Sequence, residues 1–211
     1  TGGGESTNYG ILNYGNRRNI TIKNFGNIIN FSKGIYLDNV NDSSVQNNTI
    51  DFNCSQDTYG FYLGSMSSNQ IINNTIDLYC PDDYSLAGLL VNYQYFNNNT
   101  INDNSIELYT LAVDSSAFGM RFLGTSDFGY NVIQNNLINI SYSDNSGYGI
   151  QGAGGSNCTI SDNAIWIRSF SVAEGIKFTG ANNFTFHNLT LNIHKTTDAL
   201  WGTGLYLSNV W

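Results

Sequence analysis

The feature that most constrains the fold of this chain is a glycine-led apolar motif that recurs along its whole length. The motif begins at eight positions, Gly10, Gly34, Gly60, Gly88, Gly119, Gly149, Gly175 and Gly204. The spacings between consecutive starts are 24, 26, 28, 31, 30, 26 and 29 residues. A repeat of this length is typical of solenoids, in which each unit buries an apolar face against the next. The sequence therefore predicts a stack of about eight rungs.

A second motif, an Asn followed by alternating apolar residues, lies inside each repeat. Clear copies begin at Asn48, Asn74, Asn104, Asn136 and Asn163, with a looser copy at Asn188. Because side chains alternate between faces along a strand, each rung is expected to hold three short strands separated by turns. We expect the recurring Asn to adopt left-handed backbone angles in the second turn. Its amide should also bond to the equivalent amides above and below, forming an internal ladder.

The composition agrees with strands and disfavours several other classes. The chain has 33 Asn, 22 Gly and one Pro, and Asn and Gly are poor helix formers. Asn-rich composition also occurs in disordered tracts, but the regular apolar spacing favours a folded solenoid. A net charge of −8 disfavours nucleic acid as a partner, and no apolar run is long enough to predict a membrane span. We expect a single all-β domain over residues 1–211, with residues 1–9 as a lead-in.

The glycine-led strand followed by Asn-Asn-Thr-Ile, as at residues 47–50 and 73–76, resembles the repeats of the pectin-lyase-like parallel β-helix superfamily. The resemblance covers almost the whole chain and is closest to the Asn-rich repeats of NosD-like and adhesin-like surface proteins. It implies a right-handed coil and an extracellular or cell-surface location. The superfamily hosts lyases, hydrolases, adhesins and structural proteins, so the resemblance specifies the fold and leaves the function open.

Two of the three cysteines are expected to be neighbours. Cys54 and Cys80 each end a copy of the Asn motif, so they should occupy one register position on adjacent rungs. Stacked strands lie ~4.8 Å apart, within the Cα separation that a disulfide needs. We expect a disulfide, which would indicate an oxidising compartment; the alternative is a pair of buried thiols. Cys158 is expected in the core as a small apolar residue.

Asn-x-Ser/Thr sequons are frequent and would allow N-glycosylation in a source that makes N-glycans. A chain rich in Asn, Ser and Thr also forms sequons by chance, and Asn188 is expected to be buried in the ladder. The candidate acceptors are Asn19, Asn30, Asn41, Asn47, Asn53, Asn73, Asn98, Asn139, Asn157 and Asn183.

The resemblance implies that a binding site would lie on the outer face of the first strand of each rung. Besides Leu12 and Leu90, the outward positions there are Tyr36, Tyr62, Arg121, Gln151, Lys177 and Tyr206. Aromatic rings beside cations could stack on sugar rings and bind carboxylated sugars. The alternative is a column of tyrosines that only stabilises the sheet.

The third strands are expected to carry an outward acidic column of Asp51, Asp77 and Glu107. Stacked carboxylates repel one another unless calcium bridges them or water screens them. Their expected separation, ~5 to 9.5 Å, would also suit a pair of glycosidase carboxylates. The histidines His187 and His194 are interpreted as structural, and the catalytic motifs of the superfamily's enzymes are absent. We therefore expect no cofactor, with calcium at the acidic column as the alternative.

These observations favour a non-catalytic extracellular surface or appendage glycoprotein with a structural, self-assembly or adhesive role. The alternatives are a polysaccharide-active lyase or glycoside hydrolase, or a carbohydrate-binding module, each using the outer face of the first strands. Neither end of the sequence carries an evident cap. We therefore expect either a piece of a longer solenoid or a subunit that associates end to end with itself.

Overall fold

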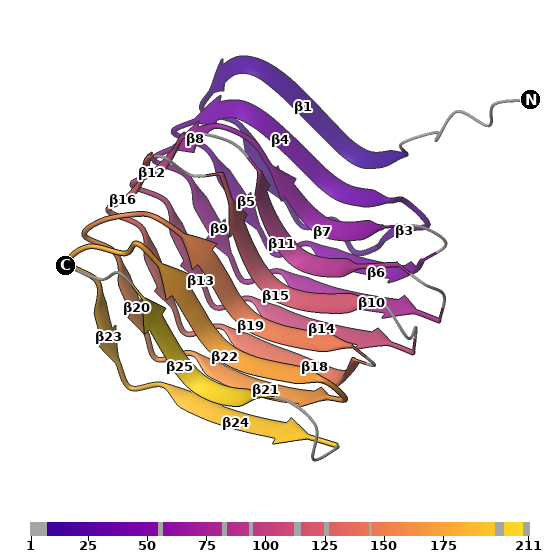
Figure 1. Cartoon of the computed structure of the whole chain (residues 1–211). Helices are drawn as coiled ribbons and strands as arrows, with labels where there is room; N and C mark the ends of the chain where they lie inside the picture. Colours follow the sequence, from indigo (N-terminus) through magenta and orange to yellow (C-terminus); the bar gives the residue numbers. More distant parts are fainter. Residues whose placement is uncertain are drawn as a thin grey trace, which may run out of the picture.

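The structure, a computed structural model, describes residues 8–54, 57–81, 84–92, 95–111, 115–124, 127–143, 145–196 and 201–208. Within these ranges all regular elements are β-strands, and every strand pair is parallel. The strands wind into a right-handed parallel β-solenoid of about seven turns with three sheets, which confirms the predicted fold (Figure 1). Of the predicted lead-in, residues 1–7 lie outside the described ranges, and Tyr9 already begins a strand.

The first sheet contains the glycine-led strands, and the chain passes through it eight times. Its strands are β1 (Tyr9–Arg18), β4 (Lys33–Asn41), β7 (Thr58–Leu63), β11 (Leu86–Asn92), β15 (Ser116–Leu123), β19 (Ser146–Ala153), β22 (Val172–Thr179) and β25 (Gly202–Ser208). Three short strands lie at the corner after this sheet: β8 (Met66–Ser67), β12 (Tyr95–Asn97) and β16 (Asp127–Gly129). The end of β4 pairs with β8, β8 pairs with β12, and β12 pairs with β16. The middle rungs therefore carry a fourth short strand that the sequence pattern did not indicate.

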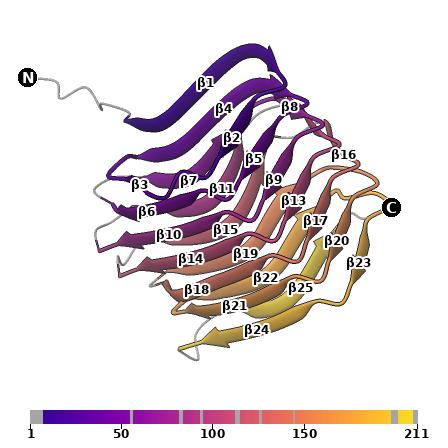
Figure 2. The same cartoon turned by 180° about the vertical axis from the view of Figure 1, so that it is seen from behind.

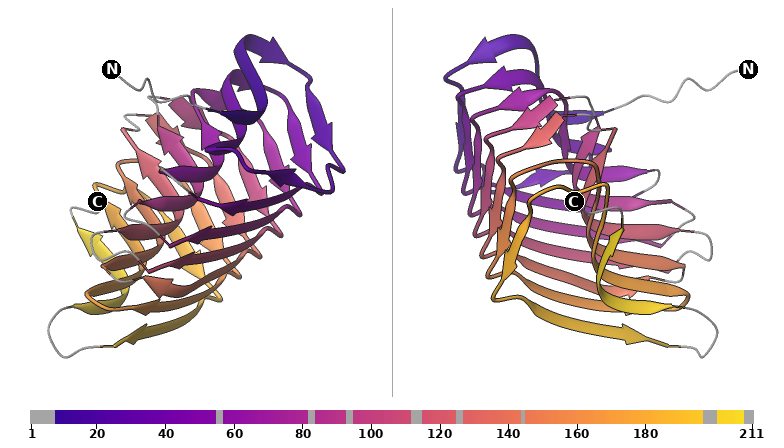
Figure 3. Two further views of the ribbon diagram at one scale, coloured as in Figure 1. Left: turned by 90° about the vertical axis from the view of Figure 1, so that its right-hand side faces the viewer. Right: turned by 60° about the vertical axis from the view of Figure 1, so that its left-hand side comes forward.

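The second and third sheets contain seven strands each. The second, seen from behind in Figure 2, comprises β2 (Thr21–Lys23), β5 (Ser44–Gln46), β9 (Gln70–Ile72), β13 (Thr100–Asn102), β17 (Val132–Gln134), β20 (Thr159–Ser161) and β23 (Thr185–His187). The third comprises β3 (Ile28–Ile29), β6 (Thr49–Asn53), β10 (Thr75–Cys80), β14 (Ser105–Thr110), β18 (Leu137–Ser143), β21 (Ala164–Ser169) and β24 (Thr190–Lys195). Successive rungs stack along one axis, from indigo to yellow in Figure 3.

The core is built from inward side chains stacked in register. In the third sheet, one isoleucine per rung forms a column of Ile28, Ile50, Ile76, Ile106, Ile138 and Ile165, each at most 5% exposed. Burying such a side chain contributes about 1.5–3 kcal/mol. Since the column continues through the stack, each rung is stabilised mainly by its two neighbours.

The glycine that begins each repeat is required by close packing between rungs. A Cβ on Gly119 would lie 2.5 Å from the carbonyl oxygen of Gly149 and 2.4 Å from Cγ2 of Ile138. At each of the other stacked glycines from Gly10 to Gly175, the carbonyl oxygen of the next glycine would lie within 2.8 Å of an added Cβ. Only a residue without a side chain allows this approach, which explains the repeat at the level of atoms.

The predicted ladder of asparagines exists and is buried. The Oδ1 of Asn74 accepts hydrogen bonds from both the backbone N–H and the Nδ2 of Asn48, each at 3.0 Å. The same pair of bonds links Asn74 to Asn104, Asn104 to Asn136 and Asn136 to Asn163. All five side chains are at most 3% exposed. These amides satisfy each other where water cannot reach.

The prediction that Asn188 extends this ladder is wrong by one residue. Ala164 pairs with Thr190, which places Leu189 opposite Asn163. Asn188 is exposed, and its Nδ2 donates to Oδ1 of Asp162 at 3.0 Å. It belongs to a different column, the left-handed residues that precede the ladder position: Asn47, Asn73, Asp103, Asn135, Asp162 and Asn188, with φ between 50° and 56°. The left-handed angles predicted for the ladder asparagines therefore belong to the residues just before them.

A second internal ladder lies in the turn before the second sheet. The Oδ1 of Asn99 accepts from the backbone N–H and Nδ2 of Asn69, and the Oδ1 of Asn131 accepts from the same two groups of Asn99. Ser43 begins this column, and its backbone N–H donates to Oδ1 of Asn69. Each of the three asparagines stands two residues before an isoleucine of the second sheet, a spacing from which this ladder could have been predicted.

Candidate binding face

The outer face of the first sheet carries the column predicted from the sequence. The pairings place Leu12, Tyr36, Tyr62, Leu90, Arg121, Gln151, Lys177 and Tyr206 in one register. We call this the second outer column. The middle of this column is less accessible to solvent than an outward position should be, since Leu90 is only 4% exposed.

A first outer column runs beside it, formed by the residues that precede each glycine. Its members are Tyr9, Lys33, Tyr59, Ala87, Phe118, Tyr148, Glu174 and Thr203. The repeat pattern did not indicate this column, because the recurring motif begins at the glycine and these residues precede it. Ala87, Leu90 and Phe118 form a small apolar cluster on the outside of the sheet, packed against Tyr59 and Tyr148. The two columns together form an aromatic face with embedded cations.

At the N-terminal end of this face, three tyrosine rings surround a lysine of the same chain. Lys33 Nζ lies 4.1 Å from the ring centroid of Tyr62, 5.5 Å from that of Tyr36 and 5.3 Å from that of Tyr9. The rings of Tyr36 and Tyr62 stack at 5.2 Å. Burial lowers the pKa of Lys33. Tyr36 and Tyr62 are thus engaged with Lys33 through cation–π contacts, which favours a stabilising role for these two rings.

Arg121 has a different environment in the middle of the face. Its guanidinium carbon lies 3.9 Å from the ring centroid of Phe118, and that ring stacks on Tyr148 at 5.0 Å. Its Nε is buried and has no hydrogen-bond partner among the residues that the structure describes. Burial lowers the pKa of Arg121, whereas Tyr59 and Tyr148 raise it. Among the described residues, no carboxylate lies within ion-pair distance of this guanidinium.

Burial also affects the phenol of Tyr59 beside Arg121. It raises the pKa of Tyr59 to about 12, and the negative charge of Asp57 adds to the effect. Tyr59 therefore stays neutral at physiological pH and can donate or accept a hydrogen bond there.

Gln151 and Lys177 continue the second outer column after Arg121. Lys177 Nζ lies 2.9 Å from Oε2 of Glu174, and it approaches the rings of Tyr148 at 5.7 Å and Tyr206 at 5.3 Å. A shallow hollow of about 200 Å³ lies alongside; it is lined by Phe122, Leu123, Gln151, Gly152, Ala153, Lys177 and Thr179. Arg121, Gln151 and Lys177 thus stand in consecutive rungs, and Gln151 and Lys177 line the hollow.

The acidic column of the third sheet is in register, as predicted. Asp51 pairs with Asp77, and Asp77 pairs with Glu107. Burial raises the pKa of Asp77, and the charges of Asp51 and Glu107 raise it further. In the described ranges, no group of three acidic, His or Cys side chains is arranged to hold a metal ion. This arrangement therefore gives no support to the alternative in which calcium bridges the carboxylates.

The three cysteines are all thiols and all buried. Cys54 and Cys80 stand in consecutive rungs, as predicted, but their sulfurs are not bonded in the structure. Cys158 is in the core, as predicted, and it also continues the second ladder. Its thiol donates to the carbonyl oxygen of Ser156 at 3.4 Å, and Nδ2 of Asn131 lies 3.9 Å from its sulfur.

The candidate glycosylation sites lie at the surface. Asn19, Asn30, Asn47, Asn53, Asn73, Asn98 and Asn183 are exposed, and Asn41, Asn139 and Asn157 are half-buried. In four of them the Nδ2 that would carry a glycan already donates a hydrogen bond to another side chain. These four are Asn47, Asn73, Asn139 and Asn183. The remaining sequons are the better candidates.

The solenoid, its two amide ladders and its aromatic outer face define a parallel β-solenoid protein. No family model, curated protein or solved structure matches the chain. In the part of the chain that the structure describes, no helix is long and apolar enough to cross a membrane.

Proposed function

We propose that this protein is a non-catalytic extracellular surface or appendage protein that adheres to acidic carbohydrate through the outer face of its first sheet. The observation that carries the proposal is the environment of Arg121. A guanidinium that lies on an aromatic ring, with no carboxylate of the described residues within ion-pair distance, is matched by a carboxylate ligand. A bound carboxylate would neutralise this charge and accept bidentate hydrogen bonds from the guanidinium.

The arrangement along the solenoid axis supports an extended ligand. Gln151 and Lys177 follow Arg121 at intervals of one rung, ~4.8 Å, so a polymer lying along the axis could contact one side chain per rung. Tyr206, 42% exposed, offers a ring face for stacking at the end of this row. Repeated acidic sugars would meet these contacts at a regular spacing.

A binding role is favoured over catalysis by the distribution of carboxylates on this face. A glycoside hydrolase uses two carboxylates about 5–9.5 Å apart. In the two outer columns the one carboxylate is Glu174, and it is paired with Lys177. We therefore assign the face to binding.

Binding to uronate polymers, compared with neutral polymers of similar length, tests the proposal. The wild type should bind the acidic polymer, and Arg121→Gln should weaken binding by roughly tenfold or more, as expected for the loss of charge-assisted hydrogen bonds. The matched control is Arg168→Gln, which removes the same charge from the exposed outer face of the third sheet and should leave binding unchanged. Equal losses in the two variants would contradict a specific site. New reducing or unsaturated ends after incubation would show an enzyme instead.

The extracellular location, N-glycosylation and kinship with NosD-like or adhesin-like surface proteins are further parts of the proposal, and they rest on the sequence resemblance. Intact mass before and after deglycosylation of protein purified from its source would test glycosylation. End-to-end association stays a prediction as well. It would be checked by the sedimentation of purified protein over a range of concentrations, where a constant monomer would count against it.

A further inference from the structure

The pair of thiols in the third sheet has a geometry that the binding function does not use. Tyr79 pairs with Asn53, and the backbone N–H of Cys54 donates to the carbonyl oxygen of Tyr79 at 2.8 Å. Cys54 and Cys80 thus face each other across one strand spacing, ~4.8 Å. This lies within the usual range of Cα separations for a disulfide, about 4.4–6.8 Å.

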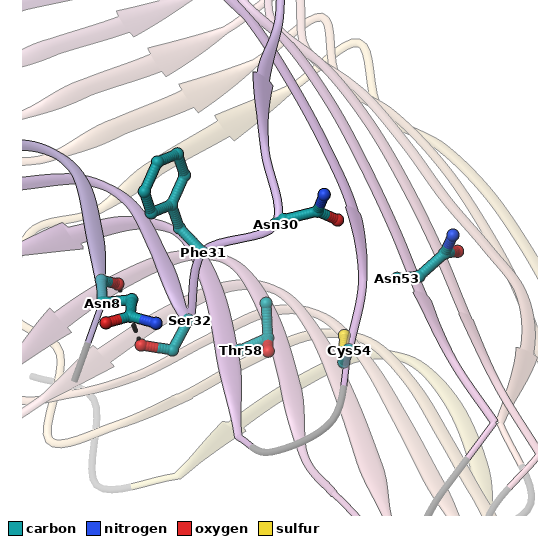
Figure 4. Close-up of a pocket in the computed structure, with 7 residues that line it drawn as sticks. All are labelled: Asn8, Asn30, Phe31, Ser32, Asn53, Cys54 and Thr58. Carbon is teal, nitrogen blue, oxygen red and sulfur yellow. Dashed lines mark hydrogen bonds between the residues drawn. The ribbon is translucent and has the colours of Figure 1, made fainter. Parts of the chain in front are cut away.

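The two sulfurs differ in their access to solvent. Cys80 is fully buried, whereas Cys54 is 7% exposed. Cys54 lines a hollow of about 180 Å³ together with Asn8, Asn30, Phe31, Ser32, Asn53 and Thr58 (Figure 4). The hollow has room for several water molecules and hence for one sulfur of a small reagent. A reagent that enters it meets Cys54 first.

The two sulfurs also differ in their chemistry. The thiol of Cys80 hydrogen-bonds to the sulfur of Cys54 and lowers the pKa of Cys54; burial opposes this effect, and the hydroxyl of Thr58 adds to it. Since the thiolate is the nucleophile in thiol–disulfide exchange, Cys54 is the better attacking group.

We propose that Cys54 and Cys80 form an oxidisable dithiol, in which Cys54 reacts first with a small disulfide in the hollow and Cys80 resolves the product. The thiolate of Cys54 attacks one sulfur of the small disulfide, forms a mixed disulfide and releases one thiolate. Cys80 then gives up its proton, its sulfur attacks that of Cys54, and the second thiolate leaves. Two electrons pass from the cysteine pair to the small disulfide, which becomes two thiols after protonation.

Cys158 provides an internal comparison. It is 1% exposed, its thiol donates to the carbonyl oxygen of Ser156, and burial raises its pKa. A buried thiol with a raised pKa is a poor nucleophile. It should therefore stay reduced while Cys54 and Cys80 react.

The test uses the full chain, first reduced and then incubated with oxidised glutathione. Samples are quenched with an alkylating reagent at successive times and analysed by intact mass and peptide mapping. We expect an early glutathione adduct on Cys54, then a disulfide between Cys54 and Cys80 with loss of the adduct, while Cys158 remains alkylatable after denaturation. Oxidation should also raise the thermal unfolding midpoint, because the bridge restricts the unfolded chain.

Variants distinguish the two roles. Cys80→Ala should accumulate the adduct on Cys54, and Cys54→Ala should show little adduct on Cys80 at matched times. Cys158→Ala should behave as the wild type does. The inference is overturned if wild-type Cys54 and Cys80 both remain thiols, if the first adduct forms on Cys80, or if Cys158 reacts as fast as Cys54. Because the time course on wild-type protein decides these outcomes, it does not depend on whether the variants fold.

Discussion

The backbone N–H and the side-chain Nδ2 of Asn104 both donate to Oδ1 of Asn136, each at 3.0 Å. Asn104 in turn accepts the same two bonds from Asn74. One amide oxygen therefore satisfies two buried donors of the neighbouring rung. Loss of the Asn104 side chain would therefore remove the acceptor of the backbone N–H of Asn74 in the neighbouring rung.

Asn104→Ala should lower the free energy of unfolding by more than about 2 kcal/mol. The backbone N–H of Asn74 would lose its acceptor, and the carbonyl oxygen of Ile71 would lose the bond from Nδ2 of Asn104. An unsatisfied buried polar group costs about 1–3 kcal/mol. Urea unfolding followed by circular dichroism measures the change. The control is Asn192→Ala at an exposed position of β24, expected within about 0.5 kcal/mol of wild type. Similar losses in both variants would mean that the ladder has no special role.

Cys158→Asn should raise the free energy of unfolding by about 1 kcal/mol. The sulfur of Cys158 occupies the next position of the second ladder, where Nδ2 of Asn131 lies 3.9 Å away. An amide oxygen there would be a stronger acceptor for the donors of Asn131, and a typical hydrogen bond contributes about 0.5–1.5 kcal/mol. Cys158→Ala, which removes the acceptor, should change stability in the opposite direction. The ladder interpretation fails if the Asn variant is the less stable of the two.

Gly119→Ala should destabilise the protein by about 1–3 kcal/mol or more, because the added Cβ forces neighbouring rungs apart. It would meet the carbonyl oxygen of Gly149 at 2.5 Å, and backbone cannot move aside as a flexible side chain can. Gly26→Ala is the matched control, since nothing lies within 4 Å of a Cβ there and φ is not positive. Thermal unfolding of both variants checks the prediction; equal midpoints would contradict it.

Asp77→Asn should stabilise the protein near neutral pH by about 0.2–1 kcal/mol, the usual size of a cross-strand pair effect. Burial, together with Asp51 and Glu107, raises the folded-state pKa of Asp77 above its ordinary value of 3.8. Ionisation therefore costs stability, and the cost is present above the folded pKa and disappears as the pH falls below 3.8. The gain from Asp77→Asn should vanish over the same range.

Unfolding free energies measured at several pH values test this dependence. Asp127→Asn removes one charge from an exposed position outside the acidic column, and it should show no comparable gain. A gain from Asp77→Asn that is independent of pH would point to a cause other than charge.

Much of the solenoid could be predicted because its rules are local. The outward column from Leu12 to Tyr206 follows from strand alternation counted from each glycine. The inward isoleucines of the third sheet and the cysteine neighbours Cys54 and Cys80 follow from alternation counted from each motif asparagine. The error at Asn188 arose because the looser copy of the motif was aligned by residue type, whereas its strand pairing places Leu189 at the ladder position.

The sequence by itself determined the rung length, the parallel stacking and the first amide ladder, because a recurring glycine and asparagine impose the same backbone geometry in every repeat. Only the tertiary structure decided what the outward side chains contact. The ammonium group of Lys33 lies over the ring of Tyr62, and the guanidinium of Arg121 lies over the ring of Phe118. Cys54 lines a hollow, whereas Cys80 is not among its lining residues. The contacts of Lys33 join side chains from different rungs, whereas Arg121 and Phe118 lie on the same strand. All of these contacts depend on how far each side chain extends across its neighbours, which a repeat pattern does not encode.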